Sequence, residues 1–262
     1  MINDIKLRSA FAAAILGIMT GVLFTGSASA SGDAVKLAKQ EWSFKGIFGT
    51  FDRGALKRGY QIYAEVCAGC HSLDFVAYRN LQEIGLDEDT VKEIAAEFEV
   101  EDGPNDEGEM FMRPARPSDR FVAPFANEKA ARASNNGAFP PDLSLMAKAR
   151  KGGPDYLYGL LIRYHEEAPD GHEIAEGMNY NEVFPGHQIA MAQPLYDETV
   201  EYEDGTPATM QQHAKDITTF LTWTASPEME ARKKLGIKVL LFLLVWTGML
   251  IALKKKIWAK LH

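Results

Sequence analysis

Residues 65–73 read EVCAGCHSL, and this stretch contains both cysteines of the 262-residue chain, Cys67 and Cys70. His71 follows the second cysteine directly. On a helix, side chains three and four positions apart lie on one face, so these three side chains would point in one direction. Two thiols at this spacing can form a disulfide, act as a redox pair or supply half of a zinc site.

The histidine favours a different chemistry, because C-x-x-C-H is the attachment signature of c-type haem. The two thiols would form thioethers with the haem vinyl groups, and the His71 imidazole would ligate the iron from the proximal side. We expect a backbone carbonyl to accept a hydrogen bond from the other ring nitrogen of His71. No further cysteine completes a zinc site, and no βαβ pattern surrounds the pair. One motif therefore predicts one covalent haem c, with a thiol oxidoreductase as the alternative.

The N-terminus has the pattern of a secretory signal peptide. Lys6 and Arg8 precede an apolar run at residues 10–24, and residues 28–30 then read ASA. Positive charge, a short apolar run and a small-residue site in this order predict cleavage after Ala30. A permanent N-terminal anchor is the alternative.

The C-terminus has the pattern of a membrane anchor. An apolar run at residues 239–253 is followed by three lysines. This run rises only about 22 Å as a helix, against roughly 30 Å of hydrocarbon. Lys238 can extend its amino group to the membrane surface, which lengthens the usable span back to Leu235. We predict one transmembrane helix, and a buried core helix is the alternative.

These ends divide the chain into three parts. Residues 1–30 are the predicted signal peptide, residues 31–230 the haem domain, and residues 231–262 the anchor with a short cytoplasmic tail. A signal peptide places the haem domain on the periplasmic side of a bacterial cytoplasmic membrane, with one crossing into membrane lipid. The formal net charge of −8 disfavours nucleic acid as a partner and favours a basic protein.

An electron-carrying haem usually has a second ligand on the other face of the iron, and a methionine thioether favours ferrous iron. Met191 lies in an irregular stretch between Pro185 and Pro194, where a loop can hold a side chain over the ring. Met146 and Met178 stay open as alternatives on chemistry alone.

Two further side chains compete with Met191. Met210 lies on a helical stripe of apolar residues, which favours a place in the core. His187 precedes Met191 by four residues. We interpret His187 as an exposed loop histidine and keep it as the main rival ligand.

Five longer stretches follow one another within residues 42–258. They read CAGCHSLDFVAYRNL, ASNNGAFPPDLS, GGPDYLYGLL, FPGHQIAMAQPLYDE and YEDGTPATMQQHAKDITTFLTW. Together they resemble the cytochrome c1 family, followed by its C-terminal membrane helix. The resemblance implies a mainly α, class I cytochrome c-like haem domain with long irregular insertions. It also implies the haem-bearing subunit of the cytochrome bc1 complex, the respiratory quinol:cytochrome c reductase.

The resemblance implies roles for individual residues. The family's axial methionine falls on Met191. Arg150 would contact a haem propionate, although a charge that complements a helix C-terminus is the alternative. Asn135 and Tyr156 are further candidates for the propionates or the pocket. Pro141 would line the haem wall, or is merely a turn residue.

The resemblance also implies partners. Single electrons would pass from the Rieske iron–sulfur protein through this haem to a soluble c-type cytochrome, beside cytochrome b in a dimeric complex, with quinol chemistry on other subunits. Acidic clusters at residues 97–109, 166–170 and 198–204 would attract a basic cytochrome, or are simply solvated loops. A stand-alone anchored cytochrome feeding a terminal oxidase or reductase, and a haem-based sensor, are the alternatives.

Hydrophobic periodicity predicts several helices. Their expected ranges are 54–70, 87–99, 143–151 and 155–163. Residues 100–120 are rich in glycine, proline and charge, which predicts a long surface loop. Thr206 before Pro207 predicts the start of another helix, and Ser226 before Pro227 that of a last helix running into the membrane. We expect few strands, at best short ones near Val183 or over residues 195–203.

Overall fold

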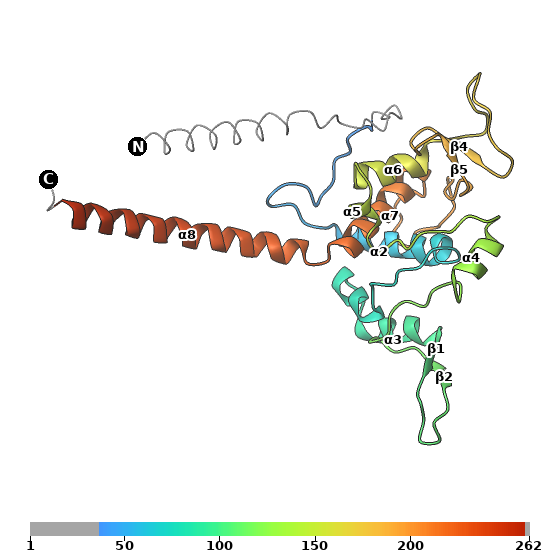
Figure 1. The fold of residues 1–262 in the computed structure, drawn as a ribbon, viewed down its shortest axis with the longest axis horizontal. Coiled ribbons are helices and arrows are strands. Elements are labelled where there is room, and N and C mark those ends of the chain that lie inside the picture. Colours follow the sequence, from blue (N-terminus) through green and yellow to red (C-terminus); the bar gives the residue numbers. More distant parts are fainter. Residues whose placement is uncertain (1–36, 260–262) are drawn as a thin grey trace, which may run out of the picture. The chain divides into compact units, whose positions relative to one another are not determined.

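The computed structural model describes residues 37–259, so the predicted signal peptide lies outside the described residues. Helices dominate the described part, and the last of them is also the longest (Figure 1). This confirms the mainly α fold class.

The helix that leads to the two cysteines changes its winding before it reaches them. α2 (Arg53–Ile62) begins after Asp52, whose Oδ1 accepts the backbone N–H of Gly54 at 2.8 Å. It continues into a π-helical turn, η2 (Tyr63–Cys67), in which the Ala68 N–H donates to the Tyr63 carbonyl at 2.8 Å. The prediction of one uniform helix to residue 70 is therefore wrong in its last turns. Wider turns of this kind occur frequently at functional sites.

A second helix, α7 (Met210–Ala225), packs against α2, α5 and α6. The crossing with α2 is close at Gly59, where a Cβ atom would lie 2.3 Å from the Asp216 carbonyl oxygen and 2.6 Å from Phe220 Cβ. The predicted apolar stripe of α7 is confirmed, since Ala214 and Ile217 are buried.

α7 begins later than the sequence predicted. Its N-cap is Thr209, whose hydroxyl accepts the Gln212 N–H at 3.2 Å. Thr206 instead donates its N–H to Asp204 Oδ1 at 2.9 Å and belongs to a preceding turn. A local side-chain turn therefore displaced the expected Thr-Pro start.

The helices between η2 and α7 are short. They are η3 (Tyr78–Ile84), α3 (Glu88–Ala96), α4 (Glu128–Ser134), α5 (Met146–Ala149) and α6 (Pro154–Ile162). α6 matches its prediction, while α5 is shorter than the expected range of 143–151. α3 ends at Ala96, three residues before the expected end at residue 99.

The predicted loop at 100–120 contains part of an antiparallel hairpin. β1 (Glu99–Asp102) pairs with β2 (Phe111–Pro114) in the register Glu99 to Pro114. Arg113 pairs with Asp102 across the hairpin and with Asp119 at 2.6 Å in the following turn. These two ion pairs stabilise the hairpin. The glycine and proline content of the segment had indicated a loop without strands.

A small antiparallel sheet follows α6, in the order β3 (Tyr164–His165), β4 (Asn179–Asn181) and β5 (Gln188–Ile189). Asn181 is fully buried and donates its Nδ2 to the Leu160 carbonyl at 2.8 Å, which joins the sheet to the end of α6. A short strand was expected near Val183. β4 ends two residues before Val183, which itself lies in a bend, and residues 195–203 form no strand.

The last helix, α8 (Met229–Trp258), has 30 residues and is about 45 Å long. Its N-cap is Glu228, so it begins two residues later than the start predicted at Ser226 and Pro227. It runs on through the apolar stretch, as predicted. Within residues 37–259 it is the one helix long and apolar enough to cross a membrane.

Candidate haem-binding site

Backbone hydrogen bonds hold the segment Cys67–His71 in one tight turn. The Cys67 carbonyl accepts the N–H groups of Cys70 at 3.1 Å and of His71 at 2.9 Å. The second bond has the i to i+4 spacing of a single helical turn, so Cys67 and His71 lie one turn apart. Both cysteines are free thiols, Cys67 half-buried and Cys70 exposed. The expected common orientation therefore has a structural basis, although the turn continues no regular helix.

The imidazole of His71 is oriented by a carbonyl from a distant segment. Its Nδ1 lies 2.7 Å from the Pro141 carbonyl oxygen. A carbonyl can only accept, so Nδ1 carries the proton and the lone pair of Nε2 is left for a metal. Burial lowers the pKa of His71, which favours the neutral imidazole that metals bind. The expected carbonyl partner is confirmed and is that of Pro141.

Further hydrogen bonds join the segment after His71 to the segment after Pro141. Asp142 Oδ2 accepts the Ser72 hydroxyl at 3.0 Å and the Asp74 N–H at 2.7 Å. The Tyr63 hydroxyl donates to the His71 carbonyl at 3.0 Å. Sequence reasoning did not single out Asp142; its only signal was its place directly after Pro141.

The thiol of Cys67 is poorly suited to redox exchange. Burial, with the neighbouring Cys70, raises the pKa of Cys67 to about 12. The thiolate is the nucleophile in disulfide exchange, so a thiol that stays protonated argues against a thiol oxidoreductase. Two thiols and an imidazole with a free Nε2, within one turn, are instead the donor set of one covalent haem c.

Met191 lies two residues after β5, in a bend, and is half-buried. Its carbonyl accepts the Tyr164 hydroxyl at 3.1 Å, so the backbone at this position is held by β3. The axial role of Met191 stays a prediction.

The competing side chains are placed differently. The sulfur of Met210 accepts a hydrogen bond from Gln193 Nε2 at 3.4 Å, at the start of α7. Met146 is buried in the core, and Met178 is half-buried.

The interpretation of His187 as an exposed loop histidine is wrong. The side chain is half-buried and stacks on Tyr180, with ring centroids 5.9 Å apart. Its Nδ1 is buried and has no hydrogen-bond partner within residues 37–259. His187 therefore stays the main rival of Met191.

The candidate propionate and pocket residues lie at helix ends. Arg150 is the exposed C-cap of α5, and Tyr156 is buried in α6. Burial raises the pKa of Tyr156, and the positive charge of Arg150 opposes that shift. Asn135 is the C-cap of α4 and donates its Nδ2 to the Ala131 carbonyl at 2.7 Å, which leaves one amide hydrogen for another acceptor.

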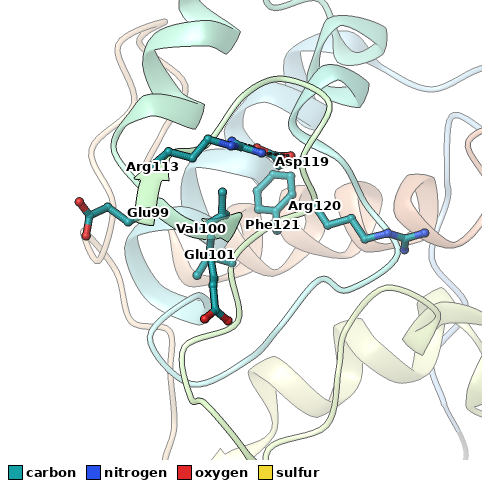
Figure 2. A pocket seen from close by; sticks show the side chains of 8 residues that line it. Glu99, Val100, Glu101, Arg113, Asp119, Arg120 and Phe121 are labelled. Carbon is teal, nitrogen blue, oxygen red and sulfur yellow. Dashed lines mark hydrogen bonds and ion pairs between the residues drawn. The ribbon is translucent and has the colours of Figure 1, made fainter. Parts of the chain in front are cut away.

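An open pocket of about 410 Å³ lies beside β1 and contains none of these residues (Figure 2). The guanidinium of Arg113 in its wall is neutralised by Asp102 and Asp119. Figure 2 shows Glu99, Glu101 and Arg120 directed away from one another. A binding pocket needs polar groups that converge, so no ligand is assigned to this one.

Comparison with known proteins agrees with this donor set. The family model described as the cytochrome C1 family matches residues 42–261. The chain is 52% identical over 248 residues to cytochrome c1 of Rhodospirillum rubrum. The matched region covers 89% of this chain and 91% of that protein. It is 51% identical over 218 residues to the mitochondrial cytochrome c1, heme protein, of Saccharomyces cerevisiae, covering 83% of this chain and 71% of that protein.

A further relative is the cytochrome b/c1 of Bradyrhizobium diazoefficiens, 48% identical over 273 residues. That match covers 95% of this chain but only 40% of the relative, so the chain spans less than half of that longer protein. With the haem-attachment turn and its oriented histidine, these matches lead to one conclusion: the chain belongs to the cytochrome c1 family.

Proposed function

We propose that the chain carries single electrons from a Rieske iron–sulfur protein to a soluble basic c-type cytochrome, within a cytochrome bc1 complex. The observation that carries this proposal is the His71 imidazole, whose Nδ1 is 2.7 Å from the Pro141 carbonyl and whose Nε2 is left for iron. Bound haem c supplies one-electron exchange at its iron. The coarser role, a c-type cytochrome electron carrier of the bc1 complex, follows from the family.

The protein's own residues hold the group and set its environment. Cys67 and Cys70 form the two thioethers, and the Pro141 carbonyl fixes the ring plane of His71. Met191 supplies the sixth ligand, from a backbone that Tyr164 holds in place. With His71 and Met191 both as ligands, the haem iron would have no open position for a substrate, which suits electron transfer.

In this proposal, residues at the α5–α6 junction and at the end of α4 would hold the haem propionates. Arg150 pairs with one of them, and Tyr156 and Asn135 contribute hydrogen bonds. Pro141 lines the haem wall in addition to its carbonyl contact. The backbone at Arg150 is ordered, since the Gly153 N–H donates to the Arg150 carbonyl at 2.9 Å.

Membrane attachment completes the proposal. α8 crosses the membrane once, with residues 231–262 as anchor and cytoplasmic tail. Residues 1–30 are cleaved, and the haem domain at 31–230 lies on the periplasmic side of a bacterial cytoplasmic membrane. Cytochrome b and the Rieske protein are the partners in a dimeric complex, and quinol chemistry takes place on those other subunits.

Exposed carboxylates attract the soluble cytochrome. Not every acid of the clusters contributes, because Asp102 pairs with Arg113 and Asp204 pairs with Arg58 at 2.6 Å. The steering field therefore comes mainly from the remaining acids, such as Glu99 and Glu101 at the base of the hairpin.

Purification from membranes tests the proposal. A cytochrome bc1 subunit brings b-type haem and a Rieske protein with it, and the reduced native protein does not bind carbon monoxide. Purification without b-type haem would favour a stand-alone anchored cytochrome. Carbon monoxide binding to the reduced wild type would favour a haem-based sensor.

A further inference from the structure

The loop before α2 carries two exposed apolar side chains at its tip. Phe48 is 83% exposed and Ile47 is 69% exposed. The same segment is firmly seated on both sides of the tip, because Phe44 and Phe51 are buried and their rings lie 5.2 Å apart. A rigid loop that presents adjacent apolar side chains to its surroundings marks an interaction surface. Figure 1 draws this loop as the blue segment that precedes α2.

Hydrogen bonds join both stems of this loop to the first residues of α8. Lys233 Nζ donates to the Phe44 carbonyl at 2.6 Å and to the Gly49 carbonyl at 3.0 Å. Glu230 Oε1 accepts the Phe51 N–H at 2.7 Å, and its Oε2 pairs with Arg53 at 2.9 Å. The two carbonyls bound by Lys233 flank the tip directly, so the tip is fixed beside this point of α8.

The level of Lys233 relative to the hydrocarbon follows from the helix length. A membrane crossing needs about 20 helical residues. If the crossing ends at Leu253, before the lysine cluster, it begins at about residue 234. Lys233 then stands at the edge of the hydrocarbon. The polar interface beyond that edge is about 5–7 Å thick, so a loop hydrogen-bonded to Lys233 lies within it.

We propose that Ile47 and Phe48 insert into the membrane interface beside α8 and form a second contact between the haem domain and the lipid surface. The partner is the boundary between acyl chains and headgroups, where an apolar tip next to basic groups is stable. The exposed Lys234 of α8 supplies positive charge beside the tip, whereas Lys45 in the loop is paired with Asp155 at 3.7 Å. Two contacts in place of one restrict how the haem domain tilts over the membrane. The proposal rests on α8 being a membrane anchor.

Spin labelling of the full-length holoprotein in vesicles of phosphatidylcholine and phosphatidylglycerol tests the proposal. Both native cysteines are thioether-linked in the holoprotein, so Phe48→Cys introduces the one thiol available for a nitroxide. Phe48 is 83% exposed, so the variant keeps the fold. The label should collide several-fold more with dissolved oxygen, which concentrates among acyl chains, than with a water-soluble nickel chelate.

Two control labels separate this inference from the anchor itself. Phe111→Cys on β2, where the side chain is 43% exposed, should report water. Leu244→Cys, within the apolar stretch of α8, should report the hydrocarbon. If Leu244→Cys reports water, the anchor has failed. If Leu244→Cys reports hydrocarbon and Phe48→Cys still favours the nickel chelate, the inference is overturned, and the tip belongs to solvent or to a protein partner.

Discussion

Replacement of Gly59 by alanine should destabilise the haem domain by forcing α2 and α7 apart. A Cβ at this position would lie 2.3 Å from the Asp216 carbonyl oxygen and 2.6 Å from Phe220 Cβ. Ordinary contacts begin near 3.5 Å, so the helices must separate by about 1 Å. Two of the nearest atoms are backbone atoms of Asp216, which cannot rotate away as the end of a long side chain would.

The expected free energy of unfolding falls by about 2 kcal/mol. Overpacking of a close-packed core costs about 1–3 kcal/mol, and the rigid backbone contact favours the upper end. The better helix propensity of alanine offsets about 1 kcal/mol of this. For a domain of this size, 2 kcal/mol corresponds to a fall in Tm of roughly 4–8 °C.

Thermal unfolding of the holoprotein, followed by far-ultraviolet circular dichroism, measures the effect. Gly236→Ala is the matched control, because Gly236 is also helical and an added Cβ meets nothing within 4 Å. The control should unfold at the wild-type temperature or slightly above it. If Gly59→Ala does the same, the crossing does not depend on this close approach and the packing argument is refuted.

Three further predictions concern the ligand, the acid range and the partner. Met191→Ala should lower the reduction potential and open the iron to carbon monoxide, while His187→Ala should do neither; the reverse pattern in a carbon monoxide titration would reassign the ligand. Hydrogen bonds from Thr206, and then Arg58, lower the pKa of Asp204 to about 2. Its contribution to stability is therefore present above the unfolded pKa of about 3.9 and is lost as pH falls towards 2. Asp204→Asn should flatten the decline of Tm over this window, and an unchanged slope would remove Asp204 from the account. Reduction of a soluble basic cytochrome should slow as ionic strength rises from about 0.01 M to about 0.15 M, because the Debye length shortens from about 30 Å to about 8 Å; a rate independent of salt in stopped-flow mixing contradicts electrostatic steering.

Local sequence signals predicted the ligand residues of the site better than the contacts that hold these residues in place. Cys67, Cys70 and His71 are neighbours in sequence, so their spacing alone identifies the donor set. The Pro141 carbonyl lies 70 residues from His71, and a backbone acceptor leaves no mark in the residue type. The widening of the turn at Tyr63 likewise follows from tertiary packing and has no sequence pattern of its own.

In the fold as well, elements with a local sequence pattern were predicted, and features that depend on distant contacts were missed. Periodicity predicted α6, the buried stripe of α7 and the continuous α8, because each presents one consistent apolar face or run. The hairpin β1–β2 was missed, since its strands are held by Arg113 bridging Asp102 and Asp119 rather than by alternating apolar residues. His187 was misplaced because a positive φ of 59° and the ring of Tyr180 turn it inward, and neither is visible in the sequence.

Mass spectrometry of the mature polypeptide tests the central claim most directly. The account predicts a single covalently added tetrapyrrole on the peptide that contains Cys67 and Cys70, with neither thiol open to alkylation. Two alkylated cysteines on a polypeptide of unmodified mass would contradict it.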